Sequence, residues 1–202
     1  MAGLTSDSLR AGIGKIAPFM AASAEELNTA DGNLGDGDLG ITMDRGMAAL
    51  LAISDELPAD VGLAIFSCAK EFTKVSGSSY GTLLATGLMS AAKSCKGNTE
   101  VPWSNFSNLL SGALDAMIAR GKGSLGDKTV LDTLDAMRSA TEGLQEPLNI
   151  LAACEAAIRK TMDAYRDKIS KLGRARMYGD KSIGLDDPGM LALRRVVDGL
   201  AG

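Results

Sequence analysis

Three aspartates and four glycines fall within residues 31–40, which read Asp-Gly-Asn-Leu-Gly-Asp-Gly-Asp-Leu-Gly. Asp31, Asp36 and Asp38 would repel one another unless a cation lay between them. Spacings of five and then two residues do not share a helix face, so their oxygens can converge only where the backbone turns, which glycine allows. Carboxylates without Cys or His suit Mg²⁺ or Ca²⁺ better than zinc, and the segment therefore predicts a hard-metal site.

Calcium motifs fit this segment poorly. A single Asp-Gly pair is more often a solvated turn than a ligand, so the whole pattern has to be weighed. An EF-hand counted from Asp31 would need Gly sixth and Glu twelfth, where the chain has Asp36 and Thr42. A calcium β-roll would need the unit in tandem, and it occurs once. Mg²⁺ is favoured, and because it keeps positions open for phosphate oxygens, we expect a phosphorylated ligand such as a nucleotide.

Composition limits the classes of protein that are compatible with this chain. The 202 residues, 46% hydrophobic and 23% charged, fit one domain over 1–202. No apolar run approaches the roughly 20 residues of a membrane span, and the first residues do not resemble a signal peptide, so we expect a cytoplasmic protein. Cys68, Cys95 and Cys154 are odd in number and widely spaced, which predicts reduced core thiols. The net charge of −4 argues against nucleic acid as a ligand.

Histidine is absent from the whole sequence. Catalysis by a Ser-His-Asp or Cys-His group, a phosphohistidine intermediate and a covalent adduct between His and a ketone are therefore excluded within this chain. If the reaction needs imidazole, a partner must supply it.

Apolar residues at helical spacing predict a succession of helices with no convincing strand. Ser6 or Asp7 can cap the first helix, and Asp187 before Pro188 is a typical start for the last. We expect an all-α fold, an eight-helix antiparallel up-and-down barrel or bundle. The predicted ranges are 5–28, 41–54, 60–74, a helix from the 76–81 loop to 93, 103–120, 129–144, 148–172 and 188–200.

Glycine-rich loops follow the first, third, fifth and seventh predicted helices. Residues 76–81, Ser-Gly-Ser-Ser-Tyr-Gly, fit either a simple helix cap or a phosphate cradle. Residues 121–129 are not a P-loop, because Asp127 separates Gly126 from Lys128; we expect Lys128 and Thr129 to face polar ligands.

Alternate connections of an up-and-down bundle lie at one end, so the four loops should meet there. Three cations would then surround one phosphate-bearing ligand beside the aspartates: Lys128, Arg174 and Lys181.

Four segments resemble, in order and spacing, the nucleotide-binding L subunit of dihydroxyacetone kinases. They are Gly-Asp-Gly-Asp-Leu-Gly at 35–40, the 76–81 loop, Gly-Asp-Lys-Thr at 126–129, and 173–189 from Gly-Arg-Ala to Asp-Pro-Gly. The likeness covers nearly the whole chain and implies an eight-helix barrel with the nucleotide at one end. Leu39 and Tyr80 depart from the family, which usually has His and Gly at these positions.

The resemblance also implies the roles of individual residues. Asp31, Asp36 and Asp38 would hold two Mg²⁺ ions and act in catalysis, together with Lys128 and Arg174. Residues implied to contact ADP or ATP are Leu39, Gly40, Ile41, Thr42, Ser78, Ser79, Gly121, Val130, Arg174, Asp187, Pro188 and Gly189.

The function that this resemblance implies is phosphoryl donation to a ketose, either dihydroxyacetone or a four-carbon ketose. A separate K subunit would hold the ketose on its own His, and the lack of His here is consistent with that division. ATP could exchange at each turnover, or a phosphotransfer protein could rephosphorylate bound ADP; a homodimer is also compatible. The alternatives are a nucleotide-binding module that regulates a partner without phosphoryl transfer, which Leu39 favours, and a structural helical bundle.

Overall fold

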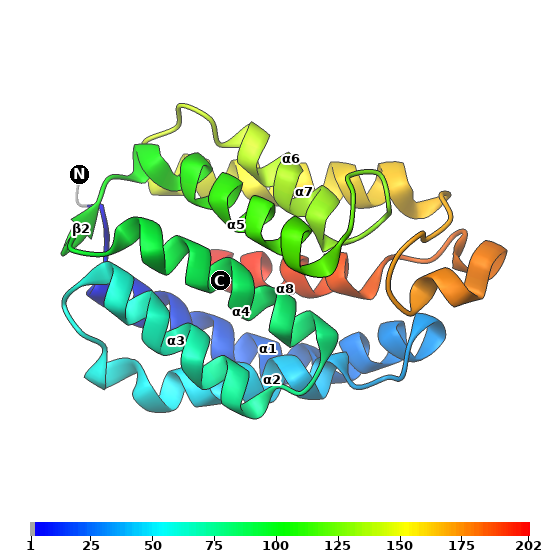
Figure 1. Ribbon diagram of the computed structural model, residues 1–202, viewed down its shortest axis with the longest axis horizontal. Coiled ribbons are helices and arrows are strands. Elements are labelled where there is room, and N and C mark those ends of the chain that lie inside the picture. The colour runs from blue at the N-terminus through cyan, green and yellow to red at the C-terminus, as the bar shows by residue number, and fades with distance from the viewer. Residues whose placement is uncertain (1–2) are drawn as a thin grey trace.

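The computed structural model describes residues 3–202 and consists of helices arranged as a ring. Each α-helix packs against the next in the chain, and the last returns to pack against the first (Figure 1). This confirms the predicted all-α, eight-helix, up-and-down fold. The α-helices of the described residues are α1 (Ser6–Leu34), α2 (Leu39–Ile53), α3 (Val61–Val75), α4 (Ser79–Cys95), α5 (Phe106–Gly121), α6 (Val130–Ala140), α7 (Pro147–Arg166) and α8 (Pro188–Ala201).

Short elements complete the connections. The 3₁₀ helices are η1 (Ser54–Glu56), η2 (Trp103–Asn105) and η3 (Ala175–Ser182). Contrary to the expectation of no strand, β1 (Leu4–Thr5) pairs antiparallel with β2 (Glu100–Val101). Two residues are too few to show the alternation by which a strand is read from sequence. The ribbon joins the start of the chain to the α4–α5 connection, at the left of Figure 1.

Several helix boundaries differ from the prediction. Helix α1 starts after Thr5, which forms a capping box with Ser8, so neither Ser6 nor Asp7 is the cap. The same helix runs six residues past the predicted end at residue 28 and includes Pro18. Helix α6 ends at Ala140 instead of residue 144, and α7 ends at Arg166 instead of residue 172. Trp103 lies in η2 and not in the first turn of the fifth helix.

The core combines aliphatic side chains with many sulfur-containing ones. Met20, Met43, Phe72 and Ile158 have no exposed surface and belong to the main apolar cluster inside the ring. The three cysteines are free and buried, as expected, and burial raises the pKa of Cys68 to about 11 and that of Cys154 to about 12. No helix among the described residues has the length and hydropathy needed to cross a bilayer.

The up-and-down order brings one set of helix starts together. Helices α2, α4, α6 and α8 all begin at the end drawn at the right of Figure 1, where the glycine-rich loops also lie. The N-terminus of a helix carries unpaired N–H groups and a partial positive charge, so this end attracts anions. We call it the loop end.

Close packing at Gly46 can be tested by substitution. A Cβ atom at Gly46 would lie 2.1 Å from Cε2 of Phe72, whose ring is fully buried and has no room to move away. We expect Gly46→Ala to lower the free energy of unfolding by about 1–3 kcal/mol in urea denaturation. Gly14→Ala is the control, because nothing lies within 4 Å of its Cβ position. That variant should be stabilised by roughly 0.5–1 kcal/mol, and equal effects at both sites would contradict the packing argument.

Candidate functional site

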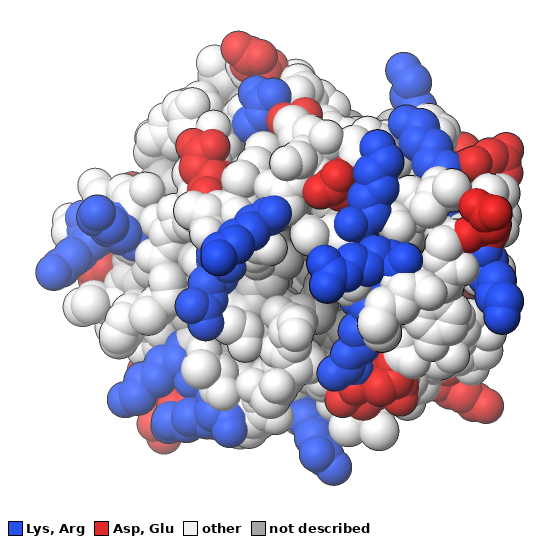
Figure 2. Space-filling model, turned by 45° about the vertical axis from the view of Figure 1, so that its right-hand side comes forward, with Lys and Arg blue, Asp and Glu red and all other residues white. Residues whose placement is uncertain are grey.

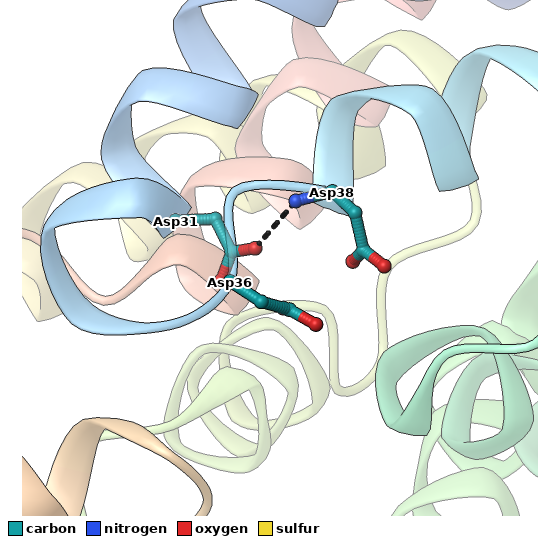
Figure 3. Close-up of side chains that lie close together, drawn as sticks. All are labelled: Asp31, Asp36 and Asp38. Carbon is teal, nitrogen blue, oxygen red and sulfur yellow. Dashed lines mark hydrogen bonds between the residues drawn. The ribbon is translucent and has the colours of Figure 1, made fainter.

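Asp31, Asp36 and Asp38 converge at the loop end (Figure 3). Each offers a carboxylate oxygen, and these three oxygens lie within 4.8 Å of one another. The residues come from three places: Asp31 from the last turn of α1, Asp36 from the connection, and Asp38 from the residue that precedes α2. A single hard cation could therefore contact all three groups, as the sequence predicts.

Asp31 also orders the start of α2. Its Oδ2 accepts hydrogen bonds from the backbone N–H of Asp38 at 3.0 Å and of Leu39 at 3.3 Å. Asp36 and Asp38 are exposed, and Asp38 makes no side-chain cap hydrogen bond at the start of α2, so each can offer one carboxylate oxygen to a metal. The donor set is all oxygen, which fits Mg²⁺.

Glycines in the connection make this arrangement sterically feasible. A Cβ atom at Gly35 would lie 2.4 Å from Oδ1 of Asp31, and Gly37 has a φ of +75°, a conformation that L residues rarely adopt. At Gly40 a Cβ atom would lie 1.9 Å from the carbonyl oxygen of Ala24 on α1. Helices α1 and α2 can approach this closely only because glycine has no side chain.

The first turn of α2 turns two of its predicted contact residues, Leu39 and Thr42, inward. Leu39 is 4% exposed and belongs to the core, and Thr42 is buried as well. Asn28 on α1 accepts a hydrogen bond from the N–H of Ile41 at 3.2 Å. Residues 39–42 can therefore offer a ligand the side chain of Ile41 and backbone groups, while Leu39, at the position of the family histidine, points away from the loop end.

The 76–81 loop is a helix cap in this structure. Ser78 is the N-cap of α4, and its Oγ accepts a hydrogen bond from the N–H of Gly81 at 3.0 Å. Ser79 is exposed in the first turn. Tyr80 donates a hydrogen bond through its hydroxyl to the carbonyl oxygen of Gly189 at 3.3 Å and thereby links α4 to the start of α8. Burial raises the pKa of the Tyr80 hydroxyl, which stays protonated.

Asp187 and Pro188 begin α8, as predicted. Asp187 Oδ1 accepts a hydrogen bond from the N–H of Met190 at 2.9 Å, and Pro188 occupies the first helical position. Desolvation raises the pKa of Asp187 to about 7, although hydrogen bonds from Met190 and Gly189 and the charge of Lys128 favour the ionised form. The start of α8 therefore carries a carboxylate that is costly to ionise.

Lys128 does not face the ligand side, contrary to expectation. The residue is 1% exposed, and its ammonium donates hydrogen bonds to the carbonyl oxygens of Arg166, Lys168 and Ser182. Its backbone is in the left-handed region, with a φ of +62°. Thr129 caps α6 in a capping box with Asp132. Val130 is buried, and Gly121 lies exposed at the end of α5.

The segment after α7 reaches the aspartates. The guanidinium of Arg174 pairs with Asp36, and the hydroxyl of Tyr178 donates a hydrogen bond to the carbonyl oxygen of Gly35 at 3.2 Å. Lys181 is exposed in η3. Lys and Arg side chains cross the middle of the face that includes the loop end (Figure 2). Arg174 is thus the predicted cation that the structure places on the aspartate cluster.

Sequence reasoning missed three residues that shape this site: Asn28, Tyr80 and Tyr178. Asn28 precedes Asp31 by three residues, so both lie on the same face of α1. The predicted helix ends at residue 28, and it therefore does not place Asn28 beside Asp31. Tyr80 was noticed only as a departure from the family pattern. Nothing in the sequence around Tyr178 marks it as a partner of Gly35.

Residues 33–202 match the family model described as the DAK2 domain. The chain is 27% identical over 191 residues to the PEP-dependent dihydroxyacetone kinase, ADP-binding subunit DhaL, of Escherichia coli (strain K12), covering 91% of this chain and 90% of that protein. The PEP-dependent dihydroxyacetone kinase 1, ADP-binding subunit DhaL, of Listeria innocua serovar 6a is 31% identical over 164 residues, covering 81% of this chain and 79% of that protein.

Longer proteins are also similar. The L-erythrulose kinase of Pectobacterium atrosepticum is 27% identical over 191 residues, but the match covers only 32% of its length. The crystal structure of the dihydroxyacetone kinase from C. freundii in complex with AMP-PNP and Mg²⁺ superposes with a TM-score of 0.75 at 21% identity. That match covers all of this chain and 34% of the solved one, so it is a likeness of fold over a third of a larger chain.

The raised pKa of Asp187 predicts a pH dependence of stability. Asn caps a helix about as well as Asp but does not titrate. With a pKa of about 7 when folded and an ordinary value near 4 when unfolded, Asp187 favours the folded state at low pH. This contribution is lost as the pH rises from about 4 to about 7.

We therefore expect the unfolding free energy of Asp187→Asn, minus that of the unchanged protein, to increase over this range and then level off. Urea denaturation without nucleotide at several pH values measures it. Asp115→Asn, at an exposed position on α5, should show a constant difference. A constant difference at Asp187 would refute the prediction.

Proposed function

The chain belongs to the DAK2 domain family, and from this premise we propose that it is the nucleotide-binding, phosphoryl-donating subunit of a dihydroxyacetone-type ketose kinase. The observation that carries the proposal is the convergence of three aspartate oxygens within 4.8 Å at the end where α2, α4, α6 and α8 begin. Metal ligands beside helix N-termini and an arginine are the groups needed to hold and polarise a polyphosphate.

The residues present fit Mg²⁺, and we propose two ions, held by Asp31, Asp36 and Asp38. Bound Mg²⁺ would offset the negative charge of the phosphates during in-line transfer. At the starts of α2, α4 and α8, the N–H groups that are not already paired with a side chain of Asp31, Asn28, Ser78 or Asp187 would bind phosphate oxygens. Arg174, which pairs with Asp36, would contact the terminal phosphate.

A partner must hold the ketose, because this chain has no His to form a covalent adduct with it. The relatives support this division. Two relatives of similar length are named ADP-binding subunits, whereas the L-erythrulose kinase is about three times longer and has room for a second unit. We propose a substrate-binding K subunit as the partner and, since the subunit relatives are named PEP-dependent, rephosphorylation of bound ADP by a phosphotransfer protein as the phosphate source.

Substitution of one aspartate tests the metal role. We expect Asp36→Asn to weaken Mg-dependent ADP binding, measured by titration calorimetry, roughly 100-fold, because a charged ligand oxygen is lost. Binding measured in EDTA should be the same for both proteins. Asp115→Asn, an exposed aspartate on α5, should bind as the unchanged protein does. Normal Mg-dependent affinity in Asp36→Asn would remove the metal from the proposal.

A reconstitution experiment separates the kinase from the regulatory alternative. The purified chain is mixed with a K subunit, Mg²⁺ and dihydroxyacetone or erythrulose, with ATP in one arm and with PEP plus the phosphotransfer proteins in the other. The kinase forms ketose phosphate in one of these arms, whereas a regulatory module forms none. ADP released in stoichiometric amount on denaturing the purified chain would support rephosphorylation in place, and its absence would support ATP exchange.

A further inference from the structure

Residues 167–184 make up most of the connection between α7 and α8 and include Arg174; we call them the arginine segment. It is the orange stretch at the loop end in Figure 1 and includes η3. Its tip touches the aspartate connection through Arg174 and Tyr178, which contact Asp36 and Gly35. The position of the guanidinium therefore depends on how this segment is held.

One ammonium group ties the two ends of the segment together. Lys128 Nζ donates hydrogen bonds to the carbonyl oxygens of Arg166 at 2.9 Å and Lys168 at 2.8 Å, where the segment begins. It donates a third, at 2.8 Å, to the carbonyl oxygen of Ser182 where the segment ends. Lysine has three N–H donors, and all three are used.

This arrangement is costly to form unless it is complete. An ammonium buried away from water loses its hydration, and this cost is offset only when all its N–H donors are paired. Loss of one carbonyl acceptor would leave a buried donor unpaired and destabilise the whole arrangement. Lys128 also has a φ of +62°, which costs energy in a residue with a Cβ atom. A group held under such cost and with 1% exposure cannot reach a nucleotide without breaking three hydrogen bonds.

Two backbone hydrogen bonds reinforce the same base. The N–H of Gly184 donates to the carbonyl oxygen of Arg166 at 2.9 Å, and that of Lys171 donates to the carbonyl oxygen of Asp127 at 3.0 Å. The second bond fastens the segment to the residue next to Lys128. The base is therefore anchored to the start of α6 independently of the contacts at the tip.

We propose that Lys128 is a positioning residue, which anchors the base of the arginine segment to the start of α6 and thereby holds the guanidinium of Arg174 over the aspartate cluster. The part of this inference that concerns nucleotide rests on the proposed function. The part that concerns the anchor rests on the hydrogen bonds alone.

Amide hydrogen exchange without nucleotide tests the anchor. Lys128→Met keeps most of the unbranched stem of the side chain and removes the ammonium, and Lys122→Met is a matched control. Lys122 also has a positive φ, +54°, but is exposed, so both variants carry the same backbone cost. We expect the amides of Ser170, Lys171 and Gly184 to exchange at least about tenfold faster in Lys128→Met. Amides of α3 and α4 should not change, and Lys122→Met should match the unchanged protein.

A double-mutant cycle tests whether Lys128 acts through Arg174. We expect Arg174→Ala and Lys128→Met each to raise the Kd for Mg–ADP about tenfold, and the double variant also about tenfold, because one contact is lost in all three. A change of about 100-fold in the double variant would show that Lys128 acts separately and would overturn the proposal. So would normal affinity in Lys128→Met, or exchange that is unchanged or equally faster throughout the protein.

The two readouts fail independently. If the unchanged protein does not bind Mg–ADP, the proposed function is wrong, while the exchange rates still decide the anchor. If Lys128→Met does not fold, the exchange experiment uses a double variant in its place, which combines Arg174→Ala with Tyr178→Phe. This variant loses the contacts at the tip, and the anchor predicts that the amides of Lys171 and Gly184 keep their exchange rates. Faster exchange there would overturn the anchor.

Discussion

Repulsion among three carboxylates is the constraint to which the loop end responds. Oxygens of Asp31, Asp36 and Asp38 lie within 4.8 Å of one another, and charges this close destabilise a protein unless each is compensated. Two backbone N–H groups meet Asp31, and the guanidinium of Arg174 meets Asp36. Asp38 stands at the start of α2, where the helix dipole is positive. The start of α2 thus balances Asp31 and Asp38, the segment after α7 balances Asp36, and the cluster holds α1, α2 and that segment together.

Groups that are energetically unfavourable to bury or to hold lie at the loop end, whereas the interior of the ring is an ordinary apolar core. The loop end contains a buried ammonium, a desolvated carboxyl at Asp187 and a left-handed backbone at Lys128. The ring interior contains apolar side chains, such as Met43 and Phe72, with no exposed surface. Such a distribution is typical of proteins in which stability built up in the core offsets the strain of a functional site.

Features that depend on local patterns could be predicted from the sequence. Apolar residues at helical spacing predicted the eight helices, and the aspartate cluster followed from charge and glycine content. The errors have tertiary causes. Helix α7 was extended to residue 172 because Ile169 continues its apolar period, yet the helix ends where Lys128, about 40 positions earlier, binds the carbonyls of Arg166 and Lys168. The sequence predicts that Lys128 faces a ligand, but its 1% exposure and its hydrogen bonds to carbonyl oxygens 38 to 54 positions away show that it points inward. No local sequence pattern reports such distant partners.

The order of the ring has a consequence for how this protein folds. Every helix interface along the ring joins neighbours in the sequence except the one between α1 and α8, which joins the first helix to the last. Contacts between neighbours close short loops and form early, while a contact that spans the whole chain has the largest entropic barrier. Asp31 lies on α1 and Asp187 at the start of α8, so the two sides of the site meet at this final seam. We therefore expect the interface between α1 and α8 to form last, so that the loop end is assembled only when the whole ring has closed.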